Sequence, residues 1–422
     1  MAAPAYAAPG PVELAARSIE TLLASARQPV LVEPGEPAFA LDPEHFHIER
    51  STRWLRLEVW DEHRVLNRRI TALRTAGPGK LTLETATLGG RHGQLLLYDE
   101  ARPQNQALNR KAAQWTGATL LERLLARHFP GYTRHRLSAG ADLEHSLSPA
   151  FPRACLVRGR EAWAAMLAPG EPEAARLVSF ALIWHHYLRT QMPHLAWKGI
   201  ALFLPEGTER QTALRLRHLN PQIAQYRLFA FTELQGAHEI DLTDAGNVLT
   251  TLAAASTTPK PRLDPEALLE WSLQQHVQNL DARLHAAPVY SQVQGLTGSQ
   301  EGLFDLLAAD LDGRLTILEL KATENLHLPI QALDYYIRTR WHLDRNEFTR
   351  QGYFPGIALS PRPPRILLAA PAHRFHSTTE IIAGYFHPDI EVDMVGLGRD
   401  LAAPPKVLFR RRLLPGPAES VR

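Results

Sequence analysis

The sequence predicts an α/β protein with a β-rich module near its N-terminal end. Residues 54–101 alternate apolar and polar side chains in runs separated by glycine-rich turns, which is typical of antiparallel strands. Residues 105–205 then show the pattern of a helix, three strands, a helix and a strand, and residues 265–370 show the same order. We therefore expect two α/β domains of similar plan after the β-rich module.

Each element of these two domains has its own signal. In the first, a helix over 105–129 ends at Gly131, and strands over 132–137, 154–159 and 161–169 precede a helix over 174–191 and a strand over 199–205. In the second, Pro265 opens a helix with an apolar stripe, followed by strands over 289–295, 303–310 and 314–321, a helix over 329–343 and a strand over 365–370.

Composition and the positions of residues that interrupt helices and strands divide the chain into four segments. Residues 1–40 are rich in alanine and proline and predict a loose tail, and residues 41–104 form the β-rich module. Residues 105–255 form the middle α/β domain and residues 256–422 the last one. Proline and threonine between residues 255 and 265 mark the boundary between these two.

The composition also excludes several classes of protein. The chain has 422 residues, 46 basic and 44 acidic, and 45% of its residues are hydrophobic, so it can bury large cores. A net charge of +2 excludes a strongly basic protein that wraps nucleic acid, and the single cysteine, Cys155, excludes an internal disulfide. Without a secretory signal or an apolar run of about 18 residues, we expect a cytoplasmic protein with no membrane partner.

A hairpin in the last domain places two acids opposite each other. If Leu311, Asp312 and Gly313 form the turn and Asp310 pairs with Arg314, then counting outward pairs residue 305 with residue 319. Asp305 and Glu319 then share one face of the sheet, and the period of two adds Lys321 to that face. A two-residue turn would instead put the two acids on opposite faces.

Two carboxylates and an amine on an apolar strand pair point to a metal site. Burying such charges is costly unless they compensate one another or bind a metal, and Mg²⁺ prefers carboxylate oxygens, water and phosphate oxygens. The metal polarises a phosphate and lowers the pKa of a bound water, and a lysine can orient that water. Glu270 on the opening helix, and Gln331 and Tyr335 on the later helix, can assist.

At these residues the sequence resembles the PD-(D/E)XK nuclease superfamily, which has the restriction-endonuclease-like fold. The resemblance rests on Glu270, Asp305, the Glu319-Leu320-Lys321 triplet, and Gln331 followed by Tyr335, with Phe304 in place of the proline that names the motif. RecB-like and mismatch-endonuclease-like members are the most similar. The resemblance implies an αβββαβ core, Asp305 and Glu319 as ligands of Mg²⁺ or Mn²⁺, Lys321 at the nucleophile, and a nucleic-acid substrate, with DNA favoured over RNA.

Other interpretations of the same residues remain open. Asp305, Glu319 and Lys321 can instead form a salt-bridged solvent face, and the chain can be a catalytically inactive nuclease-fold scaffold that binds nucleic acid or protein. The middle domain has the same order of elements but no carboxylate-x-lysine triplet, so it can be a degenerate nuclease-like core. The sequence leaves the oligomeric state undetermined. Arginines that could follow a phosphate backbone are Arg338, Arg340, Arg362, Arg365 and Arg410 to Arg412.

Overall fold

The structure is a computed structural model that describes residues 10–416 apart from 52–53, 62–63, 87–91, 139, 143, 233–235, 245, 256–264, 292, 294–304 and 401–403. The described residues form helices and three sheets, so the predicted mixed α/β class is confirmed. By its contacts the chain divides into two compact units. The first extends to Pro130 and includes Leu137–Gly140, and the second contains Gly131–Arg136 and the chain from Ala141 onward.

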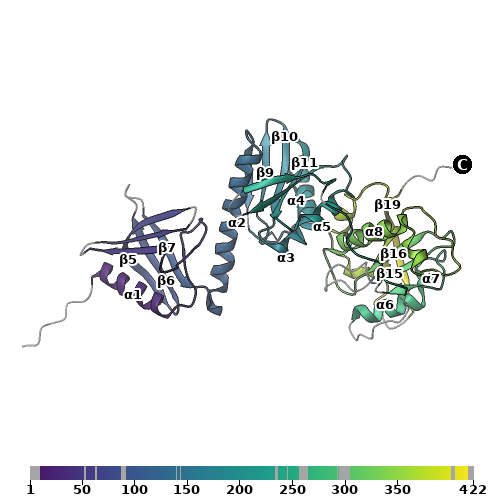
Figure 1. Ribbon diagram of the computed structural model, residues 1–422, viewed down its shortest axis with the longest axis horizontal. Helices are drawn as coiled ribbons and strands as arrows, with labels where there is room; N and C mark the ends of the chain where they lie inside the picture. The colour runs from purple at the N-terminus through teal and green to yellow at the C-terminus, as the bar shows by residue number, and fades with distance from the viewer. Residues whose placement is uncertain are drawn as a thin grey trace, which may run out of the picture. The chain divides into compact units, whose positions relative to one another are not determined.

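A seven-stranded antiparallel sheet forms the first unit, with the spatial order β2-β1-β7-β6-β5-β4-β3 (Figure 1). The predicted alternation is clear in β4, where Leu55, Leu57 and Val59 are buried and the residues between them are partly exposed. The strands are β1 Pro29–Val32, β2 Phe39–Ala40, β3 Phe46–Arg50, β4 Leu55–Trp60, β5 Val65–Gly77, β6 Lys80–Ala86 and β7 His92–Asp99.

The loose tail predicted for residues 1–40 is wrong for much of that segment, because α1 (Pro11–Ser25), β1 and β2 lie within it. Ala16, Ile19 and Leu22 recur at helical spacing and are buried against the sheet, where α1 lies in Figure 1. Alanine favours a helix and proline suits its first turn, so the composition that suggests a tail also suits a helix once an apolar face has a partner. The first unit ends with the turn η1 (Pro103–Asn105) and helix α2 (Gln106–His128).

The second unit contains two six-stranded sheets. The first has the order β13-β12-β11-β10-β9-β8, in which β10, β11 and β12 are parallel and β9 and β13 are antiparallel to their neighbours β10 and β12. We call this sheet and its helices the middle core. Its elements are β8 Thr133–Ser138, β9 Arg153–Arg158, β10 Glu161–Leu167, α3 Glu171–Ala174, α4 Leu177–Gln191, β11 Ala196–Pro205, α5 Glu209–Leu216, β12 Gln225–Thr232 and β13 Gly236–Ile240.

The last sheet has the order β14-β15-β16-β17-β18-β19, with β16, β17 and β18 parallel and antiparallel pairs at both ends. We call this sheet and its helices the C-terminal core. Its elements are α6 Pro265–Gln275, α7 Val277–Leu280, β14 Tyr290–Ser291, β15 Asp305–Ala309, β16 Leu315–Leu320, α8 Leu328–Asp344, α9 Glu347–Arg350, β17 Arg365–Pro371, η2 Ala372–Arg374, α10 Thr379–Ala383, β18 Glu391–Leu397 and β19 Val407–Pro415.

The two cores have the same topology. In each, three strands lead into a helix that crosses to a parallel strand, a shorter helix crosses to a second parallel strand, and an antiparallel strand closes the edge. In the chain, α2 of the first unit precedes the strands of the middle core, and α6 and α7 precede those of the C-terminal core. β10 and α4 of the middle core therefore correspond to β16 and α8 of the C-terminal core, and α5 corresponds to α10. Among the described residues, none of the helices combines the length and apolar character that a membrane crossing requires.

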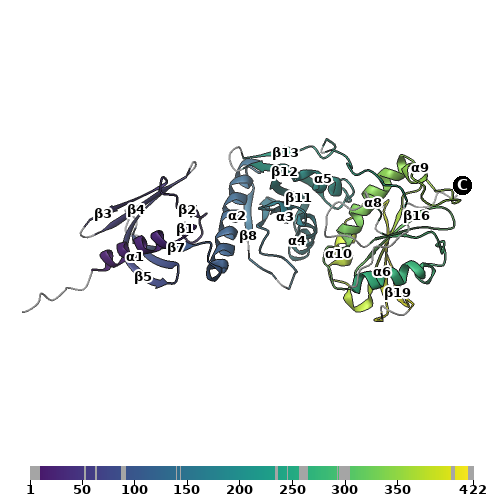
Figure 2. The ribbon, with the colours of Figure 1, turned by 60° about the horizontal axis from the view of Figure 1, so that its bottom comes forward.

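Helices α6 and α8 cover opposite faces of the C-terminal sheet, on either side of β16 in both ribbon views (Figure 2). Leu318 and Leu320 of β16 pack with the apolar stripe of α6 and α7. Leu315 and Ile317 belong to the other face, which packs with α8 and continues into the apolar core around α4 and α5. Because neighbouring residues of a strand face opposite ways, β16 presents one set of side chains to each helix.

Candidate functional site

The hairpin of β15 and β16 has the turn that the sequence predicts. The backbone N–H of Asp310 donates to the carbonyl of Arg314 at 2.9 Å, and Asp310 Oδ1 accepts hydrogen bonds from the N–H groups of Asp312 and Arg314 at 3.1 and 2.8 Å. Gly313 has a φ of +72°, a conformation that glycine adopts without strain. The predicted three-residue turn of residues 311–313 is therefore confirmed.

This turn sets the register on which the proposed site depends. Asp305 is the cross-strand partner of Glu319, and Leu307 is the partner of Ile317. Cross-strand partners occupy the same face of an antiparallel pair, so positions 305 and 319 share the face that looks toward α8. The side chain of Asp305 and all of Phe304 lie outside the described residues.

Glu319 and Lys321 form a buried ion pair. Lys321 Nζ lies 3.2 Å from Glu319 Oε1, and the two residues are only 5% and 1% exposed. Ile317 and Leu368, which are apolar and buried, flank Glu319 along β16 and on the adjacent β17. The described residues therefore do not support a salt-bridged solvent face, because both charged groups are removed from water.

Helix α8 begins close to the end of β16 and packs on the face that carries Glu319. Gln331 lies in its first turns, where its backbone N–H donates to the carbonyl of His327 at 2.9 Å. Gln331 Oε1 is buried and has no hydrogen-bond partner among the described residues. An amide oxygen in this state can accept a hydrogen bond from a bound water or ligand.

Glu270 lies on α6, the helix of the opposite face. It is 6% exposed and adjoins Leu269, which packs into the apolar cluster of that face with Leu273. The predicted single helix is divided into α6 and α7, although its apolar stripe is buried as predicted. Helix α6, which carries Glu270, lies on the face of the sheet opposite that of Glu319. Glu270 can act at the same site only if its carboxylate extends past the ends of β15 and β16 to the other face of the sheet.

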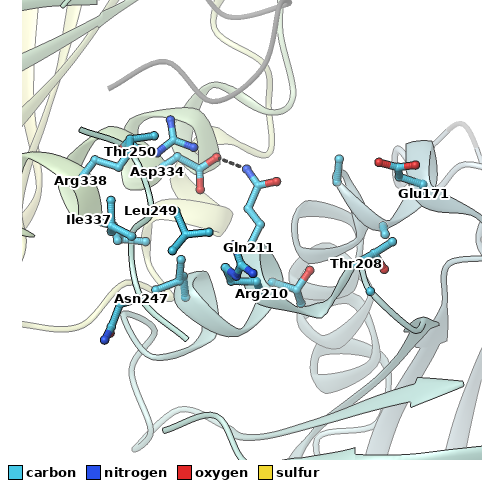
Figure 3. A pocket seen from close by; sticks show the side chains of 16 residues that line it. Glu171, Thr208, Arg210, Gln211, Asn247, Leu249, Thr250, Asp334, Ile337 and Arg338 are labelled. Atoms are coloured by element: carbon cyan, nitrogen blue, oxygen red, sulfur yellow. Dashed lines mark hydrogen bonds between the residues drawn. The ribbon is translucent and has the colours of Figure 1, made fainter. Parts of the chain in front are cut away.

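The remaining predicted residues of α8 lie further along the helix. Tyr335 is buried in the apolar core on the α8 face. Arg340 Nη1 donates to the carbonyl of Pro361 at 2.7 Å, and Arg340 Nη2 pairs with Asp344 at 2.7 Å. Arg338 lines an open pocket between α5 and α8, away from the first turn of the helix (Figure 3). In that pocket Gln211 Nε2 donates to Asp334 at 3.1 Å.

Arg365 is not a surface cation. It is 1% exposed, its Nη1 lies 2.6 Å from Asp281 Oδ2, and its Nε donates to Thr316 Oγ1 at 2.8 Å. Arg283 and Arg365 beside Asp281 hold the pKa of its carboxyl well below the usual range, although burial acts in the opposite direction. The interpretation of Arg365 as a contact to a phosphate backbone is therefore wrong, and Arg410 joins the same network at 3.3 Å from Asp281.

His327 adjoins the site and carried no signal in the sequence. It immediately precedes α8, and its Nδ1 lies 2.9 Å from Ser179 Oγ of α4 in the middle core. Burial lowers the pKa of His327 to about 4, and Arg176 and Arg215 act in the same direction. The imidazole is therefore neutral near pH 7. A contact between residues this far apart in the chain leaves no local pattern.

The middle core offers a different residue at each equivalent position. The N–H of Ala168, directly after β10, donates to Phe203 of β11 at 2.8 Å, as the N–H of Lys321, directly after β16, donates to Ala369 of β17 at 3.1 Å. Two residues earlier, Met166 takes the place of Glu319. The partner of Met166 across the ladder is Arg153, which takes the place of Asp305. The middle core thus has Arg153, Met166 and Ala168 where the C-terminal core has two acids and a lysine.

Oxygen donors of β16 and of the first turns of α8 are of the types that suit a hard divalent cation. A buried carboxylate on β16, an aspartate position opposite it in the ladder and the amide oxygen of Gln331 are the ligand types that Mg²⁺ and Mn²⁺ prefer. Histidine, cysteine, aspartate and glutamate side chains do not form a group of three or more that could hold a metal within the part of the chain that the structure describes. That part does not include the side chain of Asp305.

Comparisons with known proteins found no relative of this chain. The chain matches no family model, no curated protein and no solved structure. The geometry around Glu319 and Lys321 is therefore what supports a function.

Proposed function

We propose that the C-terminal core is a metal-dependent nuclease that hydrolyses phosphodiester bonds of nucleic acid, with DNA as the preferred substrate. The observation that carries the proposal is the buried ion pair of Glu319 and Lys321 on a strand whose register places Asp305 opposite Glu319. Replacing such a pair by apolar residues is often neutral or stabilising, so its burial is poorly explained by stability alone. The proposal includes a restriction-endonuclease-like fold for the C-terminal core.

Each residue of the proposed site has a separate task. Glu319 and Asp305 would hold Mg²⁺ or Mn²⁺, which supplies Lewis-acid polarisation of the phosphate and a lower pKa for a bound water. Lys321, held at 3.2 Å from Glu319, would orient that water and balance negative charge that develops on the phosphate. Gln331 would accept a hydrogen bond from the water or from a nearby group through its buried Oε1.

The alternative is a scaffold that keeps the fold without the chemistry. It predicts that nucleic acid or a protein partner binds but that no phosphodiester bond is broken. The middle core shows that this topology can form without the acids and the lysine, since Met166 and Ala168 occupy their places. Hydrolysis by the purified chain separates the two possibilities.

The test is a cleavage assay with single-stranded DNA, double-stranded DNA and RNA, each with Mg²⁺, Mn²⁺ or EDTA. The wild-type chain is compared with the E319Q and K321M variants. The proposal expects cleavage that EDTA abolishes and that each variant lowers by about 100-fold or more. Circular dichroism shows whether each variant is folded.

A matched control exists in the middle core. Lys198 Nζ lies 3.2 Å from Glu161 Oε1, the same separation as in the buried pair, but both side chains are exposed by more than a third. The E161Q and K198M variants should retain wild-type cleavage. Cleavage that survives unchanged in E319Q and K321M would disprove the site, and a complete lack of cleavage by the wild-type chain would favour the scaffold.

A further inference from the structure

The two cores of the second unit contact each other reciprocally. Helix α4 of the middle core packs against α10 of the C-terminal core, and α5 of the middle core packs against α8. Since α4 corresponds to α8 and α5 to α10, exchanging the two cores turns each contact into the other. Reciprocal contacts of this kind define the interface of a two-fold symmetric dimer, here within one chain.

Two short segments at the centre of this contact repeat the relationship at the level of single hydrogen bonds. The segment after α5 pairs antiparallel with the segment after α10, with Leu219 opposite Phe386. The N–H of His387 donates to the carbonyl of His218 at 2.8 Å, and the N–H of Asn220 donates to the carbonyl of Tyr385 at 2.8 Å. Exchange of the two cores maps one hydrogen bond onto the other.

A buried polar contact lies at the same interface between the two cores. His185 Nδ1 of α4 lies 2.8 Å from the hydroxyl of Tyr385, which is also buried. Around these residues a single apolar cluster combines side chains of both cores, including Leu202 and Phe386. The face through which the two cores associate is therefore occupied within the chain.

Only one of the two associated cores carries the acids and the lysine. Arg153, Met166 and Ala168 are buried at the positions equivalent to Asp305, Glu319 and Lys321. Arg153 Nη1 donates to the carbonyls of Ser148 and Phe151, each at 3.4 Å, and its guanidinium lies over the ring of Trp184. A cation and two apolar groups cannot hold a divalent metal ion, so the pair of cores has one site.

We infer that the chain is a single-chain pseudo-dimer that cuts one strand of duplex DNA per binding event, an inference that rests on the proposed function. The two strands of a duplex are related by two-fold symmetry, so a symmetric pair of active cores can cut both, whereas one active core cuts one. Water adds to phosphorus, one phosphorus–oxygen ester bond breaks, and the departing oxygen takes up a proton. The opposite strand remains intact.

Supercoiled plasmid DNA tests the inference directly. Incubation with the full chain and Mg²⁺ should convert supercoiled DNA into nicked circles, and linear DNA should appear only after nicked circles have accumulated. The initial rate should be proportional to protein concentration. A tenfold excess of the E319Q variant, mixed with wild type at saturating DNA, should leave the nicking rate per wild-type chain unchanged.

The contrary results distinguish failure of the inference from failure of the proposed function. Linear DNA that forms together with the first nicked circles would overturn the inference while leaving the proposed nuclease intact. Loss of nicking on mixing with E319Q, or cleavage confined to single-stranded DNA or RNA, would do the same. If the wild-type chain cuts no substrate, the proposed function fails and the inference fails with it.

Discussion

Arg215 of α5 donates two hydrogen bonds to Asp334 of α8, from Nε to Oδ1 at 2.8 Å and from Nη2 to Oδ2 at 2.7 Å. The guanidinium is almost fully buried, the carboxylate is largely so, and Arg215 Nη1 also donates to the carbonyl of Ala175. This bidentate pair joins the middle core to the helix that carries Gln331. The alignment of α8 thus depends on a residue of the other core.

The Asp334→Ala variant should lower the free energy of unfolding of the second unit by about 3 kcal/mol, because it leaves the buried guanidinium of Arg215 without its partner. Chemical denaturation measures the change. Asp344→Ala on the same helix is the control, since its ion pair with Arg340 is exposed and should cost less than about 1 kcal/mol. Equal losses in the two variants would contradict the importance assigned to the buried pair.

The Gly313→Ala variant should disturb the hairpin that sets the register of Glu319. A Cβ atom at this position would lie 1.9 Å from the carbonyl oxygen of Ala358, in addition to the strain of a positive φ. We expect a loss of about 2 kcal/mol or more in stability, and reduced cleavage. Gly352→Ala, at a φ of +79° with no atom within 4 Å, isolates the strain and should cost about 1 kcal/mol.

Stability should fall as the solution is acidified below pH 6.5. Burial lowers the pKa of His185 to about 3 and that of His327 to about 4, whereas both titrate near 6.5 in the unfolded chain. Between these values the unfolded state binds more protons, so each histidine destabilises the fold by up to about 1.4 kcal/mol per pH unit. Urea unfolding at pH 7, 6 and 5 should show the decrease, and the His185→Gln variant should show a shallower one. A pH dependence that is identical in the variant would rule out His185 as its source.

Cys155 should report unfolding of the middle core. The thiol is fully buried, and burial raises its pKa to about 11, so thiolate is scarce at pH 8. We expect a disulfide reagent to modify the native chain only slowly and to react at once in denaturant. Rapid modification of the native chain would show that the core around β9 opens readily.

Local patterns in the sequence were sufficient for the hairpin of β15 and β16, for helix α8 and for the register of the candidate site. The Asp312-Gly313 turn and the alternation on either side fix the pairing of residues 305 and 319, because both depend on neighbouring residues alone. The buried position of Arg365 could not be predicted in this way, since its partner Asp281 lies 84 residues away. His327 and Ser179 meet across 148 residues for the same reason.

Helix α1 is an element that local patterns in the sequence did not predict. Its apolar stripe of Ala15, Ala16, Ile19 and Leu22 is weakly hydrophobic, and alanine and proline also occur in disordered tails. Only the sheet that covers these residues decides between the two states. Local composition therefore predicts structure poorly where the stabilising surface belongs to another part of the fold.

The antiparallel pairing of residues 218–220 with 385–387 has a practical consequence for anyone who expresses the protein in pieces. A fragment that begins near Pro265 would leave Phe386 and the buried face of α8 uncovered, and a fragment that ends before that point would do the same to Leu219 and α4. Both halves would then be prone to aggregate. Biochemistry on the C-terminal core therefore calls for retaining the middle core in the same chain.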